Sequence, residues 1–70
     1  MPFPHPQAER ARKEIPRFRR LEEDHSAYEA ELEDIERVRH LTPDLEARRM
    51  TLKKLKLQAK DEMKTILGSL

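Results

Sequence analysis

Three histidines and fourteen carboxylates are the side chains of this 70-residue chain that could carry acid-base or metal chemistry. His5, His25 and His40 are too far apart in the sequence to share one turn of a helix, and the chain has no cysteine. Zinc sites usually draw pairs of histidines or cysteines from positions only a few residues apart. No nucleophile stands beside a base and an orienting group, and no glycine-rich loop could hold a phosphate. The sequence therefore predicts no catalytic residue, no metal, no cofactor and no small-molecule substrate.

Basic side chains offer a second chemistry, the binding of phosphates. Residues 48–64 contain seven bases against two acids, whereas residues 21–36 contain eight acids and no Lys or Arg. A further basic cluster precedes the acidic run and consists of Arg10, Arg12, Lys13, Arg17, Arg19 and Arg20. We interpret the bases of residues 48–64 as a helix flank paired with the acidic run. The N-terminal basic cluster is the better candidate for a contact with RNA or another anion, although a net charge of only +1 does not favour strong steering.

Alternating prolines at the N-terminus predict an extended or flexible segment. Pro2, Pro4 and Pro6 fix φ and remove three amide donors. Residues 7–14 contain helix-forming residues, so a short helix there is an open alternative. Proline is tolerated in the first turn of a helix, and we therefore place a helix start at Pro16. The expected organisation is an arm at residues 1–15 and a helical unit at residues 16–70.

The rest of the chain has the pattern of two long helices. From residue 18 to residue 35, apolar side chains recur at spacings of three and four, with His25 as the one polar member of this heptad seam. This pattern predicts a helix at residues 16–39. Thr42 is a suitable N-cap before Pro43, which predicts a second helix at 43–67, ended by Gly68 in a left-handed conformation.

A short connection between two long helices makes them antiparallel neighbours, so the predicted class is all-α, a coiled-coil-like two-helix hairpin. With the turn centred near residue 42, the numbers of opposed residues add to about 84. This register pairs apolar residues with apolar residues and the acidic run with the basic run. The predicted seam consists of Phe18, Leu21, His25, Tyr28, Leu32, Ile35, Leu45, Leu52, Leu55, Ala59, Met63 and Ile66.

A second apolar stripe is left over on the second helix. Met50 and Leu57 are one heptad apart and point about 120° to 140° away from the seam. A two-helix hairpin buries one stripe and is marginally stable alone, so we expect a second copy or another helical protein to cover this surface. Leu67, Ile15 and Phe3 are further candidates for the same contact.

The sequence gives no reason to expect export or membrane binding. No apolar run follows a charged start, and nowhere do eighteen apolar residues occur together. The second helix also lacks the wide apolar face that interfacial helices use. We expect a cytoplasmic protein without a membrane partner.

Two segments resemble the YdcH-like family of small bacterial proteins of unknown function. They are Pro16-Arg17-Phe18 with Leu21 and His25, and LKKLKLQAKDEMKTIL at residues 52–67. The resemblance covers roughly residues 15–67. It implies a cytoplasmic bacterial helical hairpin that tends to associate and has no assigned catalytic residues.

Two positions depart from the family pattern. Family members often have a longer aliphatic residue where Ala59 stands and an aliphatic residue where Tyr28 stands, which implies a different packing of the seam here.

From the sequence as a whole, our functional hypothesis is a non-catalytic interaction protein that self-associates and acts as an adaptor or accessory subunit. The alternative is a nucleic-acid- or ribosome-associated accessory protein that uses the N-terminal basic cluster.

Overall fold

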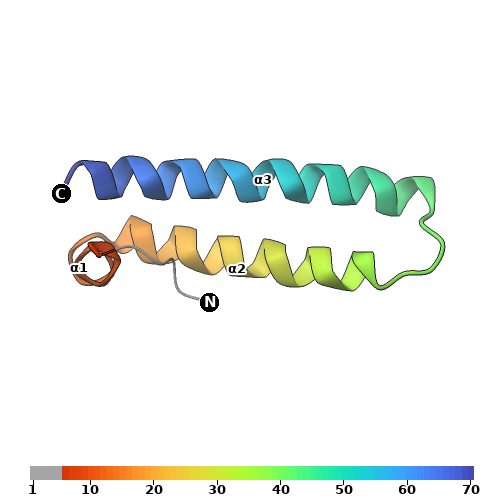
Figure 1. The fold of residues 1–70 in the computed structure, drawn as a ribbon, viewed down its shortest axis with the longest axis horizontal. Helices are drawn as coiled ribbons and strands as arrows, with labels where there is room; N and C mark the ends of the chain where they lie inside the picture. The colour runs from red at the N-terminus through yellow and green to blue at the C-terminus, as the bar shows by residue number, and fades with distance from the viewer. Residues whose placement is uncertain (1–5) are drawn as a thin grey trace.

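Three helices make up the computed structural model, which describes residues 6–70 (Figure 1). They are α1 (Ala8–Glu14), α2 (Pro16–Glu36) and α3 (Pro43–Gly68). No strand occurs in the described part of the chain, so the all-α class is confirmed. The predicted two-helix architecture is incomplete, because α1 is a third helix.

α2 and α3 run side by side in opposite directions and give the molecule an elongated shape of 44 × 17 × 16 Å (Figure 1). α2 begins at Pro16, as predicted, after Ile15 in an extended conformation, because a residue before proline avoids the helical region. α3 begins at Pro43 after the predicted N-cap, where the Thr42 hydroxyl accepts a hydrogen bond from the Leu45 amide at 3.2 Å. Both helix starts are thus set by local residue types.

Helix α2 ends at Glu36, three residues before the predicted end at residue 39. Ile35 is its last buried residue, and the Val38 side chain beyond it is 39% exposed. The Val38 amide donates to the Ile35 carbonyl at 3.1 Å, which closes the helix with a tighter turn. Residues after Ile35 bury too little apolar surface to offset the entropy of ordering them as helix.

The C-terminal end of α3 also differs from the prediction. Gly68 is helical, and no glycine in the described residues has a positive φ, so the left-handed cap is wrong. Ser69 takes the C-cap position with φ −92° and ψ −6°, and its hydroxyl donates to the Thr65 carbonyl at 3.0 Å. A serine that satisfies a carbonyl of the last turn replaces the expected glycine conformation.

Helix α1 packs across the open end of the hairpin, where α2 begins and α3 ends (Figure 1). Ala8 and Ala11 are 2% and 0% exposed, so α1 lies tightly against the hairpin. The short helix that the sequence left open for residues 7–14 is present at Ala8–Glu14. Small alanine side chains allow this close approach of one helix to the others.

The buried hydrophobic residues form two clusters along the helix pair. The cluster at the α1 end contains Ala8, Ala11, Phe18, Leu21, Ala59, Met63 and Leu67. The cluster near the connection contains Leu32, Ile35 and Leu52. Tyr28 is partly buried and packs against both clusters. Tyr28 thus connects the two clusters along the helix pair.

Candidate functional site

The residues with catalytic or metal-binding potential are scattered. His25 lies partly buried in the seam, and its Nε2 is 3.9 Å from Oε1 of Glu29. His40 is exposed in the connection, and His5 lies outside the described residues. In residues 6–70, no group of three or more His, Cys, Asp or Glu side chains is placed to hold a metal ion.

The predicted seam residues fall into two groups by burial. Those that are buried are Phe18, Leu21, Leu32, Ile35, Leu52, Ala59 and Met63. Those that are partly buried are His25, Tyr28, Leu45, Leu55 and Ile66. Every predicted seam residue is therefore at least partly buried within a single chain.

The three candidates for a partner surface have different environments. Met50 is 70% exposed and Leu57 is 58% exposed, so both are available to a partner. Leu67 is 4% exposed and belongs to the cluster under α1, which corrects its assignment. Ile15 is partly buried against the same cluster, and Phe3 lies outside the described residues. Leu67 packs with Ala8 and Ala11 of α1. The two-helix prediction left Leu67 exposed because it contained no third helix.

Four arginines of the N-terminal basic cluster form ion pairs. Arg12 donates two hydrogen bonds to the Glu22 carboxylate, at 2.6 Å and 2.9 Å, and joins α1 to α2. The hydrogen bond to Glu22 raises the pKa of Arg12 above its ordinary value. The other pairs are Arg10 with Glu14 at 2.8 Å, Arg17 with Glu62 at 2.5 Å, and Arg20 with Asp24 at 3.3 Å.

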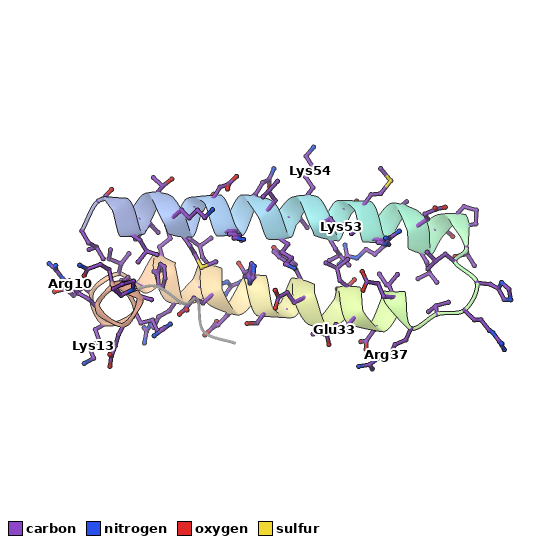
Figure 2. All side chains as sticks on the ribbon, in the orientation of Figure 1. Arg10, Lys13, Glu33, Arg37, Lys53 and Lys54 are labelled. Carbon is purple, nitrogen blue, oxygen red and sulfur yellow. The ribbon has the colours of Figure 1, made fainter. Side chains whose placement is uncertain are left out.

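The two remaining members of that cluster, Lys13 and Arg19, are exposed and form no ion pair with residues 6–70. Figure 2 shows Lys13 and Arg10 on the outer side of α1. The structure thus does not bring the six bases together as one unpartnered surface. Sequence spacing could not show this. The pair of Arg12 with Glu22 forms because α1 packs on α2, and the pair of Arg17 with Glu62 forms because α3 packs on α2.

Besides the Arg17–Glu62 pair, two further ion pairs connect α2 with α3. Arg48 binds the Glu31 carboxylate through Nε at 2.6 Å and Nη2 at 3.1 Å, and this hydrogen bonding lowers the pKa of Glu31. The Lys56 ammonium lies 3.2 Å from Oε1 of Glu29. The predicted pairing of the acidic run with the basic run therefore exists, but it involves few of the lysines.

An open groove of about 590 Å³ follows one side of the helix pair. Its α2 side carries Glu29, Glu33 and Glu36, which we call the acidic wall, and its α3 side carries Lys53, Lys56 and Lys60, which we call the lysine wall. Leu32 and Leu57 complete the lining. Figure 2 labels one residue of each wall, Glu33 and Lys53, together with Lys54, which projects from the outer edge of α3 away from α2.

Only one ion pair, between Glu29 and Lys56, joins the two walls of the groove. Glu33, Glu36, Lys53 and Lys60 make no ion pair with any residue in the described range 6–70. The sequence interpretation treated these charges as mutually paired and so missed the groove as a candidate site. The separation of acids from bases in the sequence was the feature that could have indicated the groove. The sequence does not show, however, which of these charges form ion pairs within one chain.

Comparisons of the chain with family models, with curated proteins and with solved structures find no match. The resemblance to the YdcH-like family therefore stays a hypothesis. None of the helices in residues 6–70 combines the length and the apolar character needed to cross a membrane.

Proposed function

We propose that this protein is a non-catalytic helical interaction protein that associates with itself and acts as an adaptor or accessory subunit. The observation that carries the proposal is the exposure of Met50 and Leu57, seven residues apart on the same side of α3. Isolated exposed apolar residues are common, but two large ones at heptad spacing form a stripe that a second helix can cover.

The small core supports the same proposal. Ten hydrophobic side chains are buried among the described residues, and three of these ten are alanines. A chain of this size buries a modest fraction of its surface, and small scaffolds without disulfides or metals commonly gain stability from association. Association through α3 would bury Met50 and Leu57, the two large apolar side chains that α3 exposes.

The resemblance to YdcH-like proteins agrees with a bacterial cytoplasmic protein of this kind. It supplies no activity and no partner. The proposal therefore rests on the exposed stripe and the size of the core. The family resemblance is consistent with it but is not part of the argument.

Association with RNA or the ribosome is the alternative, and the ion pairs make it weaker. Four of the six bases of the N-terminal cluster are bound to acids of the same chain. Each paired arginine would have to release its carboxylate before it could neutralise a phosphate. We therefore favour protein association over nucleic-acid binding.

Thermal melting at several protein concentrations tests the proposal. When folding is coupled to association, the melting temperature rises with protein concentration. We expect this rise for the natural chain, and a smaller rise for a variant with Met50→Gln and Leu57→Gln. Gln58→Ala, at an exposed position beside Leu57, is the matched control and retains the rise. A melting temperature independent of concentration would contradict the proposal.

A further inference from the structure

The groove between α2 and α3 has opposite charges on its two walls. One wall presents three carboxylates from a single helix, and the other presents three ammonium groups from the neighbouring helix. A patch with one sign of charge would select a ligand of the opposite sign. A patch divided lengthwise into two opposite signs selects a surface divided in the same way.

Charges on both walls remain available after the chain has folded. The Glu29–Lys56 pair uses one residue of each wall, and the other four wall residues have no ion-pair partner in residues 6–70. Two negative and two positive side chains therefore line the groove without a local counterion. An anion such as RNA would lie against the acidic wall, and an acidic peptide would meet the same repulsion.

Another copy of the chain carries the matching arrangement. When two copies meet groove to groove, a two-fold axis parallel to the helices places α2 of each copy against α3 of the other, at the same level along the molecule. Each acidic wall then faces a lysine wall. The alternative two-fold axis lies in the plane between the two grooves and runs perpendicular to the helices. It would place acidic wall against acidic wall, which repulsion between like charges disfavours.

Apolar groups are placed to support the same contact. Leu57 lines the groove and is 58% exposed, and Leu32 lies beside it in the lining. Met50, seven residues before Leu57 on α3, is 70% exposed and lies outside the groove lining. Covering Leu57 would add an apolar contribution to a contact whose orientation is set by charge.

We propose that the groove is the dimer interface, with a two-fold axis parallel to the helices and with each acidic wall bound to the lysine wall of the other copy. This inference rests on the proposed self-association and specifies its surface and symmetry. The resulting assembly is a four-helix arrangement in which α2 and α3 alternate around the axis.

Charge reversal tests this interface without removing the internal Glu29–Lys56 pair. One variant carries Glu33→Lys and Glu36→Lys, and the other carries Lys53→Glu and Lys60→Glu. In each variant alone, the wall residues outside the Glu29–Lys56 pair all carry the same sign of charge, so we expect dimerisation weakened on the order of tenfold or more at low salt. An equimolar mixture of the two should form a heterodimer with affinity near that of the natural dimer.

Sedimentation equilibrium measures these masses, and circular dichroism checks that each variant is helical. Glu23→Lys is the control, because Glu23 is an exposed α2 residue outside the groove and without an ion pair in residues 6–70. If a reversed variant loses its helicity, the corresponding glutamine substitutions replace it, and the same weakening is expected at smaller amplitude.

The outcomes separate this inference from the proposed function. Loss of dimer in each variant and its recovery in the mixture supports the groove interface. A natural chain that dimerises while both variants dimerise equally well overturns the groove interface and leaves self-association standing on another surface. A natural chain that is monomeric overturns both.

Discussion

Arg48 of α3 holds the carboxylate of Glu31 on α2 with two hydrogen bonds, Nε to Oε2 at 2.6 Å and Nη2 to Oε1 at 3.1 Å. Both side chains are close to half exposed, at 49% and 43%. The bidentate geometry adds to the apolar contacts in setting the position of α3 along α2, because a shift of either helix would lengthen both hydrogen bonds. This pair is therefore a sensitive reporter of the hairpin register.

The Glu31–Arg48 pair predicts a contribution to stability that depends on pH. The hydrogen bond from Arg48 lowers the pKa of Glu31 below its ordinary value of 4.5. A lowered folded pKa means that the stabilisation is present above this ordinary value and is lost as the pH falls through the folded pKa. We expect Glu31→Gln to lower the melting temperature at neutral pH and to have no effect in strong acid.

Glu23→Gln serves as the control for that pH series. Glu23 is exposed and makes no ion pair in residues 6–70. Any change in melting temperature that its substitution causes should therefore be the same at neutral pH and in strong acid. If Glu31→Gln lowered the melting temperature equally at neutral and strongly acidic pH, the ionised pair would not be the cause.

Leu52→Ala tests the core near the connection. Leu52 is 0% exposed and packs with Leu32 and Ile35. Truncating a buried leucine to alanine costs about 2 to 5 kcal/mol of unfolding free energy. Urea denaturation at a fixed protein concentration should show this loss, whereas Gln58→Ala on the exposed surface should change the unfolding free energy by about 0.5 kcal/mol or less. An equally small change in Leu52→Ala would mean that the register is wrong.

Ala11→Glu tests whether α1 is docked in solution. Ala11 is 0% exposed, and a carboxylate there would be buried without a partner, which the helix can avoid only by leaving the hairpin. We expect the amides of residues 8–14 to lose protection from hydrogen exchange while those of α2 and α3 keep theirs. Lys13→Ala, on the exposed side of α1, should leave the protection unchanged. Retained protection in Ala11→Glu would show that Ala11 does not lie in a tight contact.

The ion pairs of the N-terminal basic cluster predict weak interaction with nucleic acid. Since only Lys13 and Arg19 of the six bases lack an acidic partner in the described chain, retention of the natural protein on immobilised RNA should be slight even at low salt. Strong retention that falls with salt, and that disappears when the six bases are neutralised, would contradict this prediction and favour the RNA-associated alternative.

Local chemistry explains which parts of the fold could be predicted from the sequence. The starts of α2 and α3 depend on Pro16, Thr42 and Pro43, whose conformational preferences act within one turn. The heptad spacing also identifies the residues that lose solvent contact. These features need no knowledge of distant parts of the chain.

Tertiary contacts explain the parts that the sequence did not show. The burial of Leu67 and the pairing of Arg12 with Glu22 both require α1 to be docked on the end of the hairpin. The end of α2 at Glu36 depends on where burial stops. In the groove, the sequence showed that acids and bases were separated but not that Glu33 and Lys53 would both stay without an ion pair.

Sedimentation equilibrium of the natural chain over the micromolar concentration range tests the central claim most directly. Self-association through α3 and the groove predicts a mass that rises with concentration toward twice that of one chain. A well-folded species with the mass of a single chain at every concentration would contradict it.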